Sequence, residues 1–83
     1  MMIPTVHLNG TSRGELIQQL IDAKLAIDNA LTTLQRACPN GRDYYPQGQG
    51  AILRAQAEHA ERCAKLGGVA DELEQLAIAI QDA

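Results

Sequence analysis

The sequence contains no tryptophan and no phenylalanine, and its only aromatic residues are Tyr44 and Tyr45. The apolar share of 46% is therefore almost entirely aliphatic, and 13 of these residues are alanines. An alanine buries little area, whereas burying a leucine or isoleucine side chain contributes about 1.5 to 3 kcal/mol. A lone chain of 83 residues would have a thin core and no deep pocket of its own. We expect helices that pack closely through alanine and complete their burial against other copies.

Other features that are scarce exclude whole classes of protein. Two cysteines are too few for a disulfide framework, which favours a reducing compartment. No apolar run approaches the ~20 residues that a membrane span needs, and residues 1–10 lack the basic and apolar regions of a signal peptide. The formal net charge of -3 argues against a nucleic-acid coat protein. We therefore expect a cytoplasmic protein that binds no membrane and no DNA or RNA polymer.

Residues 12–38 show the pattern of one long amphipathic helix that follows a short extended segment and a turn at residues 1–10. Ser12 and Glu15 form a capping box at its start. The helix is expected to end at Cys38, because Pro39 disfavours helical geometry in the residue before it. Its apolar positions alternate in steps of four and three: Leu16, Leu20, Ala23, Ile27, Ala30, Leu34 and Ala37, with Ile17, Ile21 and Leu31 widening the stripe.

Residues 51–82 repeat this pattern after a loop at residues 39–50. The loop is longer than the two to eight residues that usually join helices in bundles. The pattern continues through Gly67 and Gly68, although each glycine costs about 1 kcal/mol in a helix interior. It favours one helix, kinked or pinched there, over a break into a third helix. The repeating positions are Ile52, Gln56, His59, Cys63, Leu66, Ala70, Leu73, Ala77 and Ile80.

Two apolar stripes joined by one loop predict an all-α fold, a single-domain antiparallel helical hairpin over residues 1–83 that assembles into a homo-oligomer. Residues that face each other are then expected to have numbers that add up to about 86. Residues 73–80 are expected to extend beyond the start of the first helix and to cover the N-terminal segment or a second copy. The expected neighbours are Leu34 with Ile52, Ile27 with His59, Ala23 with Cys63, and Leu20 with Leu66.

His59 and Cys63 have the spacing of half a zinc site, and Cys38 would be the obvious third ligand. In the expected hairpin, Cys38 lies about 22 Å from Cys63 along the helix axis. We therefore expect neither a metal nor a disulfide between these cysteines. The simpler interpretation is that both are small buried apolar residues. No Ser-His-Asp or Cys-His order and no converging acids point to catalysis. The expectation is a protein that is not an enzyme and has no cofactor.

The charge is distributed unevenly, and this is the main chemical indication. Residues 29–57 contain Arg36, Arg42 and Arg54 against the single acid Asp43, a balance of +2, whereas the rest of the chain totals -5. Both tyrosines lie in the same stretch. Guanidinium groups bind phosphate and aromatic rings stack on bases, so this loop suits a small planar anionic ligand. In the alternative, the arginines are solvated near helix ends and the tyrosines pack the tip of the hairpin.

A second candidate site surrounds the start of the first helix, where Asn9, Thr11 and Arg13 lie beside free backbone N–H groups. The alternative is an ordinary helix cap. In one hairpin the two sites lie at opposite ends of a ~39 Å helix, but an antiparallel pair of hairpins brings them together. His59, with Gln56, interrupts the apolar stripe, either to specify the register or to contact a ligand.

Three strings carry a resemblance to known proteins: Val6-His7-Leu8-Asn9-Gly10-Thr11-Ser12, Pro39-Asn40-Gly41-Arg42-Asp43-Tyr44-Tyr45 and Glu58-His59. They resemble a group of short proteins common in tailed-phage genomes. In general form the chain is also similar to the viral sponge proteins, which are small helical oligomers that sequester nucleotide immune signals such as cyclic dinucleotides or cyclic ADP-ribose isomers. The resemblance implies a phage anti-defence protein in the host cytoplasm.

Together these features predict a homo-oligomer that captures a nucleotide-type signal at protomer interfaces. In this hypothesis Arg13 and Arg42 hold phosphates, and Tyr44 and Tyr45 stack on a base. The remaining contacts are hydrogen bonds from Asn9 and Thr11 and a secondary contact from His59. The alternative is a non-catalytic helical module for phage assembly or regulation that binds a protein through its alanine-rich faces.

Overall fold

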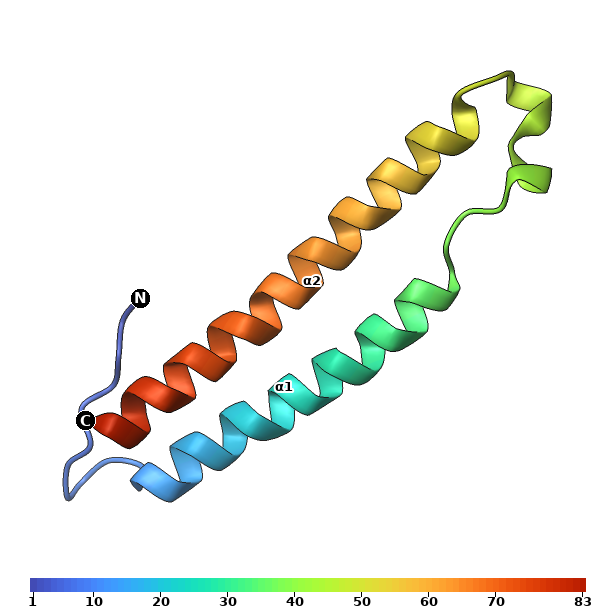
Figure 1. Cartoon of the computed structure of the whole chain (residues 1–83). Coiled ribbons are helices and arrows are strands. Elements are labelled where there is room, and N and C mark those ends of the chain that lie inside the picture. The colour runs from blue at the N-terminus through green and yellow to red at the C-terminus, as the bar shows by residue number, and fades with distance from the viewer.

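The computed structural model describes all 83 residues and shows an antiparallel hairpin of two helices without strands (Figure 1). Helix α1 covers Arg13–Arg36 and helix α2 covers Ala51–Asp82. Two single-turn 3-10 helices, η1 at Gly41–Asp43 and η2 at Tyr45–Gln47, lie in the connection. The molecule is a rod of 62 × 20 × 17 Å. The expected all-helical hairpin is therefore confirmed.

Local hydrogen bonds define where the helices begin and end. The Ser12 hydroxyl accepts a hydrogen bond from the backbone N–H of Glu15 at 3.2 Å, as in a capping box. Helix α1 ends at Arg36 because the next two N–H groups, of Ala37 and Cys38, bond to carbonyls three residues back. Gly50 precedes α2 with a φ of 88°, a conformation that glycine adopts without strain.

Helix α2 continues without a break through Gly67 and Gly68. A Cβ atom on Gly67 would lie 3.6 Å from Leu31 Cδ2, which is ordinary van der Waals contact, and one on Gly68 would meet open space. Close packing therefore does not require glycine at either position.

The two helices pair in a different register from the one expected. Residues that face each other have numbers that add up to about 98, as shown by Leu31 with Gly67 and by Ile17 with Gln81. The predicted sum of about 86 is wrong by about twelve residues, which is ~18 Å of helix. The four expected pairs, Leu34 with Ile52, Ile27 with His59, Ala23 with Cys63 and Leu20 with Leu66, are therefore wrong as well.

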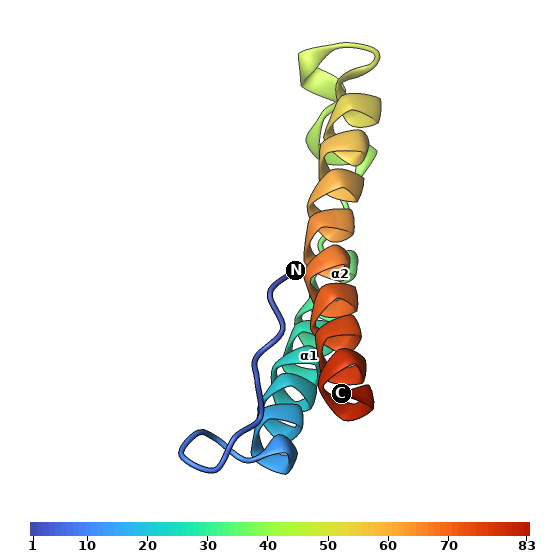
Figure 2. The ribbon, with the colours of Figure 1, turned by 90° about the vertical axis from the view of Figure 1, so that its left-hand side faces the viewer.

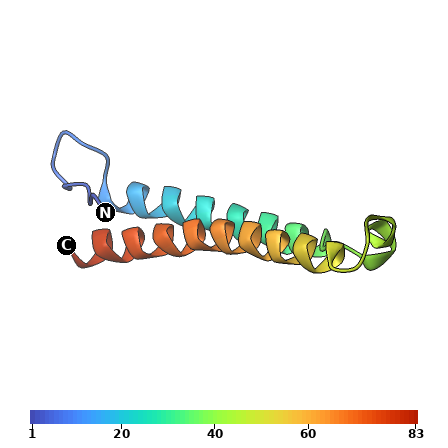
Figure 3. The same ribbon diagram turned by 90° about the horizontal axis from the view of Figure 1, so that it is seen from above.

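The cause of this shift is the connection, which does not turn back at the end of α1. Residues 37–50 continue along the axis of the rod through η1 and η2, and α2 begins well beyond α1 (Figures 1 and 3). At the other end of the rod, the start of α1 is level with the end of α2. Arg13 Nη2 donates a hydrogen bond to the main-chain oxygen of Ala83 there, at 2.9 Å. The expected overhang of residues 73–80 is therefore wrong, and the first turns of α2 overhang instead.

The N-terminal segment, residues 1–10, forms an arm beside the last turns of α2 (Figure 2). The N–H of Gly10 bonds to the carbonyl of His7 at 3.1 Å and closes a turn there. A Cβ atom on Gly10 would lie 2.8 Å from His7 Nε2, so the His7 ring packs directly over this glycine. A larger residue at position 10 would have to displace the exposed His7 ring.

The buried face of α1 contains larger side chains than expected. Ala23, Ala30, Ala37 and Gln56 are exposed, which corrects their placement in the interface. Helix α1 is rotated so that bulkier aliphatic side chains bury more area, and the alanines remain outside. In α1, Ile17 and Leu31, which were expected to widen the stripe, are partly buried, and so is Lys24, which was not expected there. In α2, Ala55 is partly buried in place of Gln56.

The core is as thin as the composition predicts. Only His59, Ala70, Ala77 and Ile80 are buried, and Ile80 is the most deeply buried large side chain, at 1% exposure. Many large apolar side chains stay exposed, among them Leu8, Leu25 and Leu53. Neither helix has an apolar stretch of the length and hydropathy that a membrane crossing requires.

Candidate functional site

A shallow hollow lies where the loop folds back on the first turns of α2. It has a volume of about 150 Å³ and is lined by Tyr44, Gln47, Ala51, Arg54, Ala55 and Glu58. The half-buried Tyr44 belongs to the loop, whereas Arg54 and Glu58 lie one turn apart on α2. The hollow thus combines an aromatic ring, a guanidinium group, a carboxylate and an amide, which suits a small planar polar ligand.

The two 3-10 turns give this part of the loop a defined shape. Asn40 Oδ1 accepts a hydrogen bond from the N–H of Arg42 at 3.0 Å, and the N–H of Asp43 bonds to the carbonyl of Asn40 at 3.0 Å. Arg42 is exposed and forms no ion pair, and Tyr45 is 77% exposed. Neither residue lines the hollow. The structure therefore places Tyr44 in the candidate site and leaves Arg42 and Tyr45 on the surface beside it.

The second candidate site, around the start of α1, is open to solvent. Asn9, Thr11 and Arg13 are all exposed, and no pocket forms among them. Arg13 makes a hydrogen bond to the main-chain oxygen of Ala83, so the guanidinium also joins the two ends of the chain. This end and the loop end lie at opposite ends of the rod (Figure 1). One chain therefore presents two separate partial sites.

His59 is not exposed to a ligand. Its side chain is 7% exposed, and its Nε2 lies 3.7 Å from Cys63 Sγ, one turn further along α2. The observed register places His59 level with residue 39, where the connection leaves α1. Its burial fits a polar residue of the packed face of α2, and it does not line the hollow.

Along the axis of the hairpin, Cys38 and Cys63 lie closer together than expected. With the observed register Cys38 is level with about residue 60, so the predicted separation of about 22 Å from Cys63 is wrong. Both cysteines are free thiols, with Cys38 exposed and Cys63 half-buried. No group of three or more His, Cys, Asp or Glu side chains comes together in the way that a metal ion needs.

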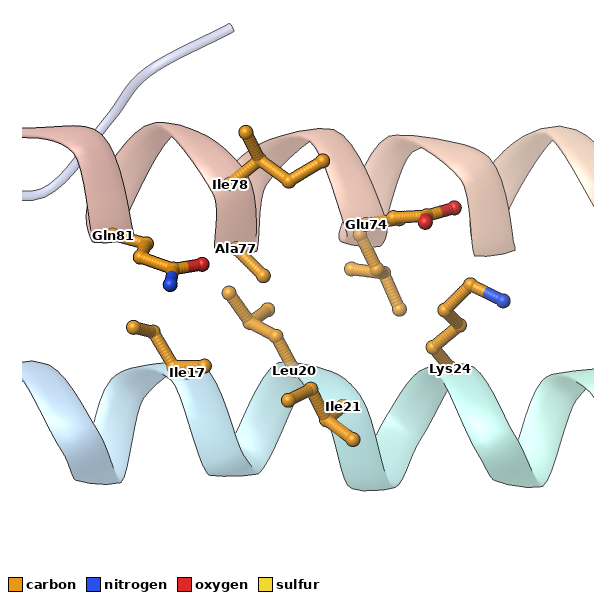
Figure 4. A pocket seen from close by; sticks show the side chains of 9 residues that line it. Ile17, Leu20, Ile21, Lys24, Glu74, Ala77, Ile78 and Gln81 are labelled. Atoms are coloured by element: carbon orange, nitrogen blue, oxygen red, sulfur yellow. The ribbon is translucent and has the colours of Figure 1, made fainter.

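The largest cavity is a groove that the sequence analysis did not identify. It measures about 220 Å³ and lies between α1 and α2 near the ends of the chain (Figure 4). Ile21 and Ile78, at its edges, are partly exposed and lie beside the main apolar stripes. Ile21 and Ile78 come together only in the observed register of the two helices. The spacing of residues within either helix therefore could not predict the groove. Its lining consists of Ile17, Leu20, Ile21, Lys24, Leu73, Glu74, Ala77, Ile78 and Gln81.

Acidic residues gather at one end of this groove, around Lys24. Lys24 Nζ donates a hydrogen bond to Asp28 Oδ2 at 2.8 Å. That bond, together with the charges of Asp28, Glu74 and Asp71, raises the pKa of Lys24 above 10.5, while partial desolvation opposes the rise. One lysine thus faces three carboxylates. The groove has an apolar floor and a rim that is acidic at the Lys24 end, where Glu74 is the one carboxylate among the lining residues. This suits an apolar side chain with a basic neighbour.

Comparison with known proteins finds no matching family model, no matching curated protein and no matching solved structure. The site is therefore interpreted from its own residues.

Proposed function

We propose that this chain is a non-catalytic homo-oligomeric protein that captures a nucleotide-type ligand between protomers. The observation that carries the proposal is the hollow at the loop end, where Tyr44 and Arg54 line one surface. An aromatic ring offers a stacking face to a base, and a guanidinium group forms paired hydrogen bonds with phosphate. This end is the basic part of an otherwise acidic chain.

The remaining contacts would come from residues around the hollow and from a second copy. Arg42 and Tyr45 lie on the loop and are free to close over a ligand. Asn9, Thr11 and Arg13 are too far away in the same chain and would be supplied by the partner. The small number of buried residues supports self-association, because one hairpin covers little of its own apolar surface. As a phage protein, the chain would act by sequestering an immune signal of the host.

Calorimetry with a panel of cyclic dinucleotides, cyclic ADP-ribose and its isomers tests this proposal. We expect saturable heat for at least one ligand of the panel, with no more than one ligand bound per protomer. Linear ADP-ribose and AMP serve as controls for charge alone and are expected to bind more weakly. The absence of heat with every cyclic ligand at micromolar protein, with an unchanged thermal melt, would contradict the proposal.

A second candidate function rests on the groove in Figure 4. An apolar groove flanked by two helices is a common docking surface for a third helix. The chain would then be a helical module for phage assembly or regulation. In that case the calorimetry above gives no heat, and substitutions in the loop leave its activity unchanged.

A further inference from the structure

We propose that the groove between α1 and α2 binds the loop end of a second copy, so that two hairpins pair antiparallel about a two-fold axis. This inference rests on the self-association in the proposed function and adds the interface and the orientation. The interface would be a face of α2 together with the edge of α1 that holds Ile21.

One face of the hairpin is large enough for such an interface. A stable protein–protein contact buries about 800 Å² on each partner. One face of a rod of 62 × 20 Å provides more than this area. Ile21 and Ile78 at the groove and Leu53 near the loop are all exposed in the single chain. A second copy that covers them would add the burial that the thin core lacks.

The charges select the antiparallel orientation. Residues 33–65 form the loop half of the hairpin, because residues 33 and 65 are level in the observed register. This half carries a formal charge of +2, from Arg36, Arg42, Arg54, Arg62 and Lys65 against Asp43, Glu58 and Glu61. The other half carries -5, from Arg13 and Lys24 against Glu15, Asp22, Asp28, Asp71, Glu72, Glu74 and Asp82. Antiparallel pairing places the basic half against the acidic half, whereas parallel pairing opposes like charges.

The exposed side of α2 carries a large apolar side chain near each end, Leu53 and Ile78. Between them, Ala57, Ala60 and Ala64 are exposed and small. A two-fold contact that places Leu53 of one copy opposite Ile78 of the other covers both side chains, and the alanines let the helices approach closely.

This pairing would complete the divided ligand site. An axis near the middle of α2 places the loop of each copy beside the start of α1 in the other. Arg42 and Tyr44 of one copy would then face Arg13 of the second copy. Each dimer would hold two equivalent composite sites.

Cysteine cross-linking tests the orientation. Both native cysteines are replaced, as Cys38→Ser and Cys63→Ala, and a single cysteine is introduced at either Gln49→Cys in the loop or Ala83→Cys at the opposite end. Both positions are exposed. We expect a short bismaleimide to cross-link a mixture of the two variants and neither variant alone. Circular dichroism and light scattering on each variant check its fold and its oligomeric state.

The outcomes separate this inference from the proposed function. A monomer by light scattering would overturn both. A folded dimer in which each variant cross-links to itself would overturn the antiparallel orientation and leave self-association intact. A folded dimer without any cross-link would also overturn the placement of the loop beside the partner's first helix.

The variant Leu53→Glu tests the groove itself. Leu53 is 68% exposed, so the substitution leaves the single hairpin folded, but it adds a carboxylate opposite an acidic rim. We expect the dissociation constant of the dimer to rise at least tenfold. Leu8→Glu, on the arm, is the matched control, and its dissociation constant is expected to stay unchanged. Equal dissociation constants for both variants and the unaltered chain would show that the loop end does not occupy the groove.

Discussion

The substitution Ile80→Ala is expected to cost about 2 to 5 kcal/mol of unfolding free energy. Ile80 is the most deeply buried large side chain, and the other two buried apolar residues are alanines, so little of the core can compensate for its loss. For so small a domain this loss is comparable to the whole stability. Urea denaturation followed by circular dichroism measures it, at one fixed protein concentration because the oligomer couples to folding.

The matched control is Leu8→Ala, which removes a side chain of the same composition from a position that is 98% exposed. We expect its unfolding free energy to change by less than about 0.5 kcal/mol. Similar values for the two variants would contradict the assignment of Ile80 to the core.

The extents of the helices could be predicted because their signals are local. A hydrogen bond between Ser12 and Glu15, which are three residues apart in the sequence, marks the start of α1. Gly50 precedes α2. The end of α1 differs by two residues, because Pro39 affects more than the residue before it. The N–H groups of Ala37 and Cys38 donate hydrogen bonds to carbonyls three residues back, as in a 3-10 turn, so the α-helix ends before them.

The register could not be predicted because it depends on the path of the whole connection. Composition identifies residues 39–50 as a loop but does not say whether they turn back or continue along the axis. Two 3-10 turns and the positive φ angles of Gly48 and Gly50 set that path. The choice of face was ambiguous for a related reason. Ala23 and Ala30 fit the period as well as Ile17 and Leu31, and only the packing of the second helix selects the larger side chains.

The sequence predicts the two partial sites, at the loop and at the start of α1, but not the groove between the helices. A hairpin of any register separates Arg13 from Arg42, so their positions at opposite ends follow from topology. The groove beside Ile21 and Ile78 needs the correct register and was missed. His59 stands on the apolar stripe in the sequence, and its burial agrees with the structural interpretation of that position.

The substitution Arg42→Ala is expected to weaken binding of the cyclic nucleotide found by calorimetry by about 3 to 5 kcal/mol, which raises a micromolar dissociation constant more than about a hundredfold and beyond detection at micromolar protein. The melting temperature should hardly change, because Arg42 is exposed and forms no ion pair. A large loss of stability would instead indicate that Arg42 serves to fold the loop.

The central claim is that each site takes residues from two copies, and mixing two inactive variants tests it most directly. Arg42→Ala and Arg13→Ala are each expected to abolish binding. Co-refolded in equal amounts, they form mixed dimers in which one site has lost both arginines and the other retains both. Random pairing therefore restores about a quarter of the binding sites of the unaltered protein. Titration calorimetry of the mixture counts these sites: recovery of about a quarter with unaltered affinity is the predicted result, and no recovery from two folded, dimeric variants would contradict the shared site.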